Sequence, residues 1–103
     1  MKVILNTDNH IQGNDSLAEH VDGVVENALG RFSNQVMRVE VHLSDANGGK
    51  AGSGDKHCVM EARLEGRPPV AANNDAETVR EAIVGAARKL QRALDSSLGR
   101  LSG

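Results

Sequence analysis

Four side chains that could take part in acid–base chemistry lie in separate parts of the sequence: Asp8, His10, Asp45 and His57. They could meet at one end of a folded sheet, but nothing in their spacing requires it. The chain has no nucleophile elbow, no paired catalytic carboxylates and no phosphate-binding loop. Its glycine-rich stretch at 45–55 leads into a predicted strand, and not into the helix N-terminus that phosphate sites use. The sequence therefore predicts a protein that is not an enzyme.

Two short patterns resemble metal sites but lack the required ligands. The stretch that begins at Asp45 starts like a calcium loop, yet Lys50 and Lys56 occupy the positions where that loop has glycine and glutamate. His57 and Cys58 are neighbours on a predicted strand, so their side chains point to opposite faces and cannot easily share a metal. Cys58 has no cysteine partner in the chain, and we interpret it as a small buried hydrophobe. We expect no metal and no cofactor.

Basic side chains gather near the C-terminus on a predicted helix. Arg88, Lys89 and Arg92 crowd its second half, Arg80 lies earlier and Arg100 lies beyond it. The spacing of Arg80, Arg88 and Arg92 places them on one side of the helix, away from its apolar stripe. One interpretation is structural, because bases late in a helix complement its dipole. The other is that these five residues contact an RNA ligand, since arginine pairs with phosphate through two hydrogen bonds.

Length and composition limit the functions that the chain can have. Its 103 residues fit one domain with little room for a deep cavity, so we expect no small-molecule substrate. The formal net charge of −2 argues against indiscriminate nucleic-acid binding but leaves room for a local basic patch. The N-terminus lacks a signal-peptide apolar region, no apolar run is long enough for a membrane span, and the lone cysteine fits a reducing compartment. These features predict a cytoplasmic protein without a membrane partner.

The spacing of apolar residues predicts two helices. The first spans about 16–31, and a Ser-x-x-Glu capping box at 16–19 marks its start. The second spans about 75–98 and is capped by Asn74 or Asp75. Its long apolar stripe consists of Val79, Ile83, Ala86, Leu90, Leu94 and Leu101.

Four strands accompany these helices. A first strand at 2–8 is rich in β-branched residues, and a short strand at 70–73 follows two prolines, which place it at a sheet edge. Strict alternation of apolar and polar residues predicts strands at about 36–44 and 56–65. Between them, 45–55 holds four glycines and no large apolar group, which predicts a mobile loop. The residues expected to face the core are Met37, Val39, Val41, Leu43, Cys58, Met60, Ala62 and Leu64.

The element order β-α-β-β-β-α predicts an α+β fold. A four-stranded sheet with both helices packed on one face buries every apolar stripe. The other face of the two alternating strands mixes charges of both signs, which cross-strand ion pairs explain without any ligand. We expect a single domain over residues 1–103.

Three stretches resemble the ribosome hibernation-promoting factors, also called ribosome-associated inhibitor or sigma-54 modulation proteins. They are V-E-V-H-L-S-D at 39–45, M-E-A-R-L-E-G-R-P-P at 60–69 and A-I-V-G-A-A-R-K-L-Q-R-A-L at 82–94. The last is similar to the second helix of that family, where an Ala-Ile start leads to a Lys-Leu-x-Arg-x-Leu core. The resemblance covers the whole chain in the same element order. It is to the short form of the family, without a C-terminal dimerisation domain.

This resemblance implies a fold like that of double-stranded RNA-binding domains. It also implies docking on the small ribosomal subunit, with 16S-type rRNA as the ligand, in the channel used by tRNA and mRNA. The effect would be to block translation and store idle ribosomes under stress. By position, Lys89 and Arg92 match basic sites of the family's second helix, while Asp95-Ser96-Ser97 departs from it where further lysines are expected. A module that binds RNA or protein on the same scaffold without hibernation activity is the alternative, and a small enzyme or metal protein is a third.

Overall fold

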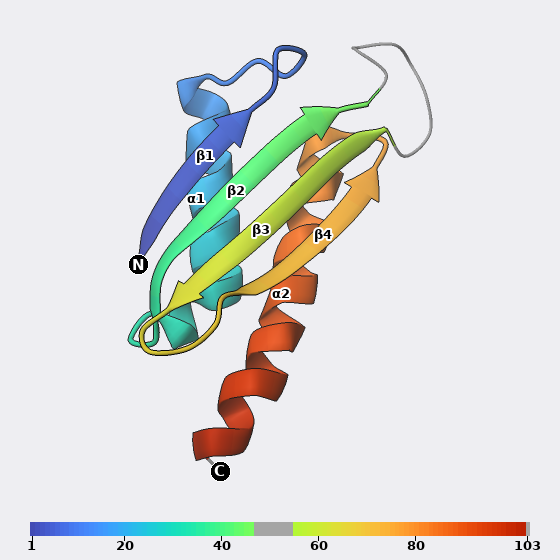
Figure 1. Cartoon of the computed structure of the whole chain (residues 1–103). Coiled ribbons are helices and arrows are strands. Elements are labelled where there is room, and N and C mark those ends of the chain that lie inside the picture. The colour runs from blue at the N-terminus through green and yellow to red at the C-terminus, as the bar shows by residue number, and fades with distance from the viewer. Residues whose placement is uncertain (47–54, 103) are drawn as a thin grey trace.

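The computed structural model describes residues 1–46 and 55–102, with side chains described as far as Leu98. Most of the predicted mobile loop, residues 47–54, lies outside the described residues. The elements follow the predicted β-α-β-β-β-α order, with a short 3-10 helix added after the first α-helix (Figure 1). They are β1 (Lys2–Thr7), α1 (Asp15–Leu29), η1 (Gly30–Phe32), β2 (Val36–Asp45), β3 (Lys56–Leu64), β4 (Val70–Ala76) and α2 (Val79–Ser102).

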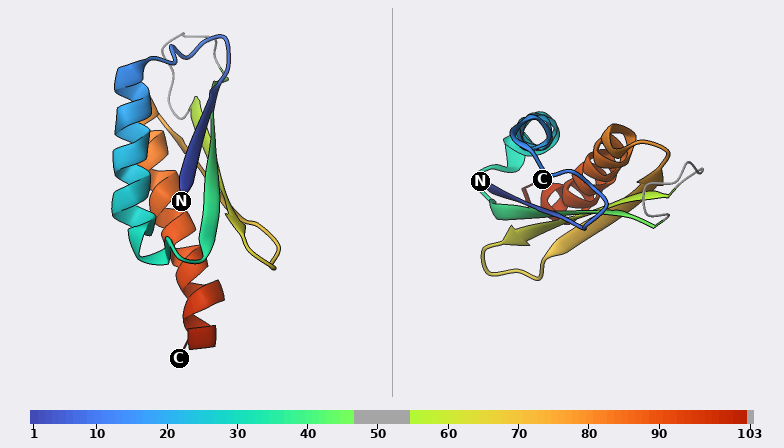
Figure 2. Two further views of the ribbon diagram at one scale, coloured as in Figure 1. Left: turned by 90° about the vertical axis from the view of Figure 1, so that its left-hand side faces the viewer. Right: turned by 90° about the horizontal axis from the view of Figure 1, so that it is seen from above.

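The strands form one mixed sheet in the order β1-β2-β3-β4. β1 runs parallel to β2, and the other neighbouring strands are antiparallel. α1 forms the crossover between the parallel strands, and both helices cover the same face of the sheet, as Figures 1 and 2 show. β4 lies at the sheet edge, where the two prolines before it predict it. The predicted α+β architecture is confirmed.

One apolar core fills the space between the sheet and the two helices. Of the stripe predicted on α2, Ile83, Ala86, Leu90 and Leu94 are buried in this core and Val79 is partly buried, while the side chain of Leu101 lies outside the described residues. No helix in the described part of the chain is long and apolar enough to cross a lipid bilayer. The core side chains that are almost completely buried include Val21, Val25, Leu29, Val39, Val41, Cys58, Met60, Ile83, Leu90 and Leu94.

The inward position predicted for Met37 is wrong. β2 contains a bulge, because Val36 pairs with Leu64 while Arg38 pairs with Arg63, so two steps along β2 match one step along β3. The extra residue in β2 shifts the alternation at this point. Met37 therefore faces outward, where its side chain is 54% exposed, and Val36 is buried instead. From Val39 onward the predicted alternation holds.

The start of α1 also differs from the prediction. Asn14 is the N-cap, and its side-chain oxygen accepts a hydrogen bond from the backbone N–H of Leu17 at 2.8 Å. The capping box predicted at 16–19 is therefore wrong, since the helix has already begun at Asp15. The helix ends at Leu29, and the chain tightens into η1, which buries Phe32.

α2 begins later than predicted because β4 is longer than predicted. Residues 74–76 continue the strand and pair with β3, so neither Asn74 nor Asp75 caps the helix. Thr78 takes that role: its hydroxyl accepts a hydrogen bond from the backbone N–H of Glu81 at 3.1 Å and donates one to the Glu81 carboxylate at 2.9 Å. The helix then runs from Val79 to Ser102, beyond the predicted end at residue 98.

Candidate functional site

The four side chains considered for acid–base chemistry lie near one end of the sheet, but the contacts there are structural. The Asp8 carboxylate accepts hydrogen bonds from the backbone N–H groups of His10 at 3.0 Å, Ile11 at 3.1 Å and Asp45 at 2.9 Å. The hydrogen bond from Asp45 is the main reason that the pKa of Asp8 lies below its ordinary value. Asp8 thus joins the turn after β1 to the end of β2, and it is not placed as a free base.

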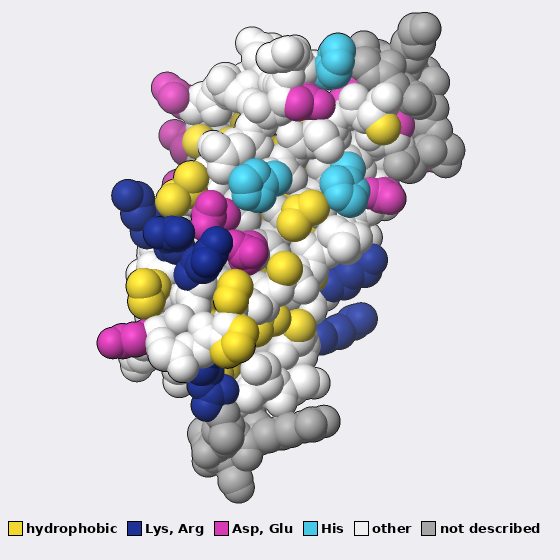
Figure 3. Space-filling model, in the orientation of Figure 1, with side chains coloured by type: hydrophobic (Ala, Val, Ile, Leu, Met, Phe, Trp, Pro, Cys, Tyr) yellow, Lys and Arg dark blue, Asp and Glu magenta, His cyan; other side chains and the backbone are white. Residues whose placement is uncertain are grey.

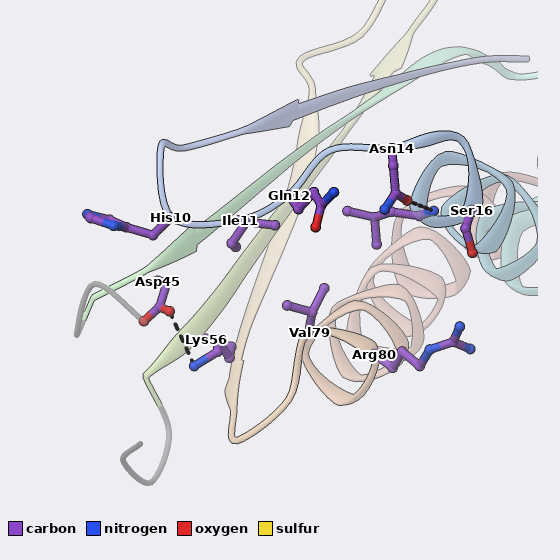
Figure 4. Close-up of a pocket in the computed structure, with 10 residues that line it drawn as sticks. His10, Ile11, Gln12, Asn14, Ser16, Asp45, Lys56, Val79 and Arg80 are labelled. Carbon is purple, nitrogen blue, oxygen red and sulfur yellow. Dashed lines mark hydrogen bonds and ion pairs between the residues drawn. The ribbon is translucent and has the colours of Figure 1, made fainter. Parts of the chain in front are cut away.

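A hollow of about 300 Å³ lies beside this turn, next to the first residues of α1 and α2 (Figure 4). Lys56 reaches into the region and forms ion pairs with Asp45 at 3.4 Å and Asp55 at 3.0 Å. The hydrogen bond to Asp55 is the main reason that the pKa of Lys56 is raised. Lys56 is therefore already paired with both carboxylates, whereas Arg80, which also lines the hollow, forms no ion pair with a described residue. No group of three potential metal ligands occurs among the described residues.

His57 and Cys58 point to opposite faces of the sheet, as the alternation predicts. The imidazole of His57 pairs with the Asp75 carboxylate, which lies directly across from it on β4. Cys58 is fully buried, and burial raises the pKa of its thiol to about 12. The two side chains therefore share no ligand site.

The open face of the sheet carries charges of both signs that are paired with one another. Arg63 lies 2.9 Å from Glu61 and 3.4 Å from Glu40, and Arg38 lies 3.2 Å from the same Glu40 oxygen. Figure 3 looks onto this face and shows acidic, basic and histidine side chains intermixed. The cross-strand pairing predicted for this face is confirmed for Arg63 with Glu40, whereas the other two pairs lie within a single strand. With these cations paired, the face presents no uniform positive charge to a ligand.

The described basic residues of α2 differ from those of the sheet in that their side chains are not paired with carboxylates of the described part of the chain. Arg80, Arg88, Lys89 and Arg92 are all exposed, and none of their side chains forms an ion pair or hydrogen bond with another described residue. We call these four residues the α2 basic surface. In Figure 3, Lys and Arg side chains project beyond β4, at the edge of the molecule where α2 lies. The fifth candidate, Arg100, has a side chain that lies outside the described residues.

The α2 basic surface wraps around the solvent side of the helix. Arg80 and Arg88 line one hollow of about 380 Å³, together with Val84 between them. Lys89 is one turn after Gly85, which lies against β4, so Lys89 is on the flank nearer the sheet edge. The prediction that Arg80, Arg88 and Arg92 share one side is confirmed for Arg80 and Arg88; Arg92 is exposed but does not line this hollow, and Lys89 extends the surface sideways.

The exposed side of α1 is acidic and points away from α2. The helix contains no lysine or arginine, whereas its carboxylates recur every three or four residues and are all exposed. Val24 and Ala28 face α2, and helical geometry places them on the opposite side of α1 from the carboxylates. This acidic stripe, which was not singled out in the sequence, consists of Asp15, Glu19, Asp22 and Glu26.

The sequence interpretation did not identify one group of residues at the contact between the two helices. Val84 stands four residues after Arg80 and four before Arg88, so an apolar side chain interrupts the basic spacing. This interruption could have indicated the site from the sequence, because an apolar residue within a charged helix face suggests that the face contacts another element or lines a hollow. In the structure Val84 and Arg88 also line a second hollow, of about 240 Å³, against Val24, Asn27 and Ala28 of α1.

A comparison with protein families decides the relationship of this chain. The family model described as sigma 54 modulation protein / S30EA ribosomal protein matches residues 4–102. The chain belongs to this family. Its members are associated with the ribosome, and the family is not known as one of enzymes. The resemblance found in the sequence is therefore confirmed.

Two solved structures share the fold. The crystal structure of the N-terminal domain of Protein Y from Thermus thermophilus aligns with a TM-score of 0.74 at 16% identity, covering 94% of this chain and 99% of that chain. A ribosomal subunit interface protein from Coxiella burnetii aligns with a TM-score of 0.69 at 12% identity, covering 99% of this chain and 98% of that chain. No curated protein sequence matches the chain. At these identities the structural likeness shows the fold alone.

Proposed function

We propose that this protein docks on the small ribosomal subunit through the α2 basic surface, with 16S-type rRNA as the ligand. Docked there, it blocks the channel used by tRNA and mRNA and promotes hibernation of the ribosome. Membership of a ribosome-associated family supports docking on a ribosome, and the name of the Coxiella burnetii protein refers to a ribosomal subunit interface. The choice of subunit and channel is our proposal.

The observation that carries the proposal is the contrast between the cations of α2 and those of the sheet. Arg38 and Arg63 of the sheet are neutralised by Glu40 and Glu61. The α2 basic surface has no such acidic partners among the described residues. Unpaired arginines can form two hydrogen bonds with a phosphate without first breaking an internal ion pair.

The acidic stripe of α1 supports a defined orientation on RNA. It lies on the far side of α1 from α2, so a phosphate at Arg88 is separated from the carboxylates by the width of α1. The same stripe explains how a net charge of −2 is compatible with RNA docking. The charge is distributed unevenly, and long-range repulsion would turn the α1 side away from the rRNA.

Two double variants that remove equal charge test this proposal. Arg88→Gln with Arg92→Gln removes two cations of the α2 basic surface, and Arg38→Gln with Arg63→Gln removes two cations of the sheet face. We expect the α2 variant to bind purified small subunits more weakly in sedimentation, with a salt slope reduced by about two, because each lost phosphate contact removes about one. The sheet variant should bind as the wild type does, and circular dichroism should show both variants folded.

A competition experiment tests the channel. Small subunits filled with tRNA and mRNA should bind less of this protein, and the wild type should lower peptide synthesis by purified ribosomes more than the α2 variant does. Equal sedimentation of wild type and α2 variant, insensitive to salt, would contradict docking through α2. Retention of the protein on duplex RNA without any binding to subunits would favour the alternative, an RNA-binding module without hibernation activity.

A further inference from the structure

The hollow of about 240 Å³ between α1 and α2 combines an apolar floor with polar groups at its opening. Val24 and Ala28 of α1 and Val84 of α2 are only partly buried, so apolar surface remains open between the helices. The side-by-side arrangement of the two helices over the sheet is visible in Figure 2. This volume is below the roughly 300–1,000 Å³ of sites for drug-sized ligands, so it suits a single small group.

The polar groups at the opening are free to bind a ligand. Asn27 of α1, and Arg88 and Gln91 of α2, line the hollow, and their side chains form no hydrogen bond with any described residue. Each amide offers one acceptor and two donors within a plane, and the guanidinium of Arg88 is a planar cation. An aliphatic side chain of a protein partner would cover the apolar side chains but form no hydrogen bond with either amide.

An unpaired nucleobase can use both kinds of group in the hollow, because its ring is apolar on its faces and its edges form hydrogen bonds. Bases stack on arginine planes and expose hydrogen-bonding edges when they leave the helical stack, which is how proteins usually read RNA. The donor and acceptor of an asparagine or glutamine amide match the N6 and N7 edge of adenine. A ring against Val24, Ala28 and Val84 would present that edge to one of the two amides, because a single amide pairs with both N6 and N7.

The charges next to the hollow fit the backbone of the same nucleotide. Arg88 and Val84 also line the neighbouring hollow that contains Arg80, so the two hollows adjoin along α2. The acidic stripe lies on the other side of α1. We infer that the α1–α2 hollow holds one unpaired adenine of rRNA while its flanking phosphates contact Arg80 and Arg88. This inference rests on the proposed function and names the nucleotide that the docking surface recognises.

Nuclear magnetic resonance on the whole chain tests the hollow without ribosomes. Adenosine monophosphate is titrated to millimolar concentration, with inorganic phosphate and uridine monophosphate as comparisons. We expect adenosine monophosphate to shift the side-chain amide signals of Asn27 and Gln91 and the methyl signals of Val84, and inorganic phosphate to leave these signals in place. Identical shifts with phosphate and with the nucleotide, or no shift with the nucleotide, would overturn the inference.

An amide variant separates this inference from the proposed function on the small subunit itself. Asn27→Leu with Gln91→Met keeps size and charge but removes the hydrogen bonds, and Gln35→Met with Asn73→Leu makes the same changes at exposed positions elsewhere. We expect the first variant to bind small subunits with about tenfold lower affinity in co-sedimentation and with an unchanged salt slope. The second variant should bind as the wild type does. Wild-type affinity of the first variant, with loss of binding by Arg88→Gln and Arg92→Gln, would refute the adenine site and leave docking through α2 intact. Failure of the wild type to bind subunits would refute the proposed function, while the nucleotide titration would still decide the hollow.

Discussion

The side chain of Asn74 lies directly against the backbone of Gly85. A Cβ atom at position 85 would come within 2.1 Å of Asn74 Nδ2 and 2.5 Å of its Cγ, which no real contact tolerates. The same amide donates a hydrogen bond to the backbone carbonyl of Glu81 at 3.3 Å. The end of β4 and the second turn of α2 therefore approach closely because position 85 has no side chain. This contact fixes the helix that carries the α2 basic surface against the sheet edge.

Replacing Gly85 should destabilise the protein even though alanine is the better helix former. We expect Gly85→Ala to lower the free energy of unfolding by at most about 1 kcal/mol in urea denaturation, because the Asn74 side chain must turn away and lose its hydrogen bond to Glu81. Gly23→Ala is the matched control, since nothing lies within 4 Å of a Cβ there. That change should raise the free energy of unfolding by about 0.5–1 kcal/mol through helix propensity. Partial rescue of Gly85→Ala by Asn74→Ala would establish the contact as the cause, and equal stabilisation at both glycines would contradict it.

Because of the bulge in β2, Met60 and Met37 should contribute very differently to the free energy of unfolding. Met60 is completely buried, whereas Met37 is 54% exposed. We expect Met60→Ala to cost about 2–5 kcal/mol of unfolding free energy and Met37→Ala to cost less than about 0.5 kcal/mol. Chemical denaturation of the two variants measures the difference. Similar losses at both positions would mean that the strand has no bulge and that Met37 faces the core.

The hydrogen bonds to Asp8 should make stability depend on pH in a defined direction. Because the pKa of Asp8 is lowered in the folded protein, its contribution is present above the unfolded pKa and is lost as the pH falls through the folded pKa. We expect Asp8→Ala to melt at a lower temperature than the wild type at pH 7, and the gap to close as the pH falls below about 4. Asp22→Ala removes an exposed carboxylate of α1 that forms no hydrogen bond or ion pair with a described residue, and it should change the melting temperature little. A gap between Asp8→Ala and wild type that is constant with pH would exclude the carboxylate as its source.

The thiol of Cys58 should be unreactive in the folded protein. Its pKa of about 12 leaves it protonated at pH 8, and its side chain is fully buried. We expect a thiol reagent to label the native protein far more slowly than the urea-unfolded protein, and Cys58→Ala to fold with a loss of about 1 kcal/mol. Rapid labelling of the native form, or one equivalent of zinc or iron that disappears in Cys58→Ala, would overturn the interpretation of Cys58 as a buried hydrophobe.

The sequence determined the elements and most of the faces because those features depend on local spacing. Alternation at period two placed Val41 and Met60 inside, and spacing near 3.6 placed Ile83 and Leu90 on the core side of α2, as the structure confirms. The basic residues of α2 were also identifiable from spacing, since exposure of one helix side follows from burial of the other.

The tertiary structure decided the features that depend on a partner strand or helix. The bulge at Met37 exists only relative to β3, and β4 extends to Ala76 only because β3 offers it hydrogen bonds, which delays α2 to Val79. Whether a cation is free is a matter of distance in space: Arg63 has glutamates within 3.4 Å, while Arg88 has none among the described residues. Spacing along one chain segment cannot give those distances, because they are set by how separate segments pack. The sequence therefore specified which residues carry the charge, and packing decided which of those charges remain available to a ligand.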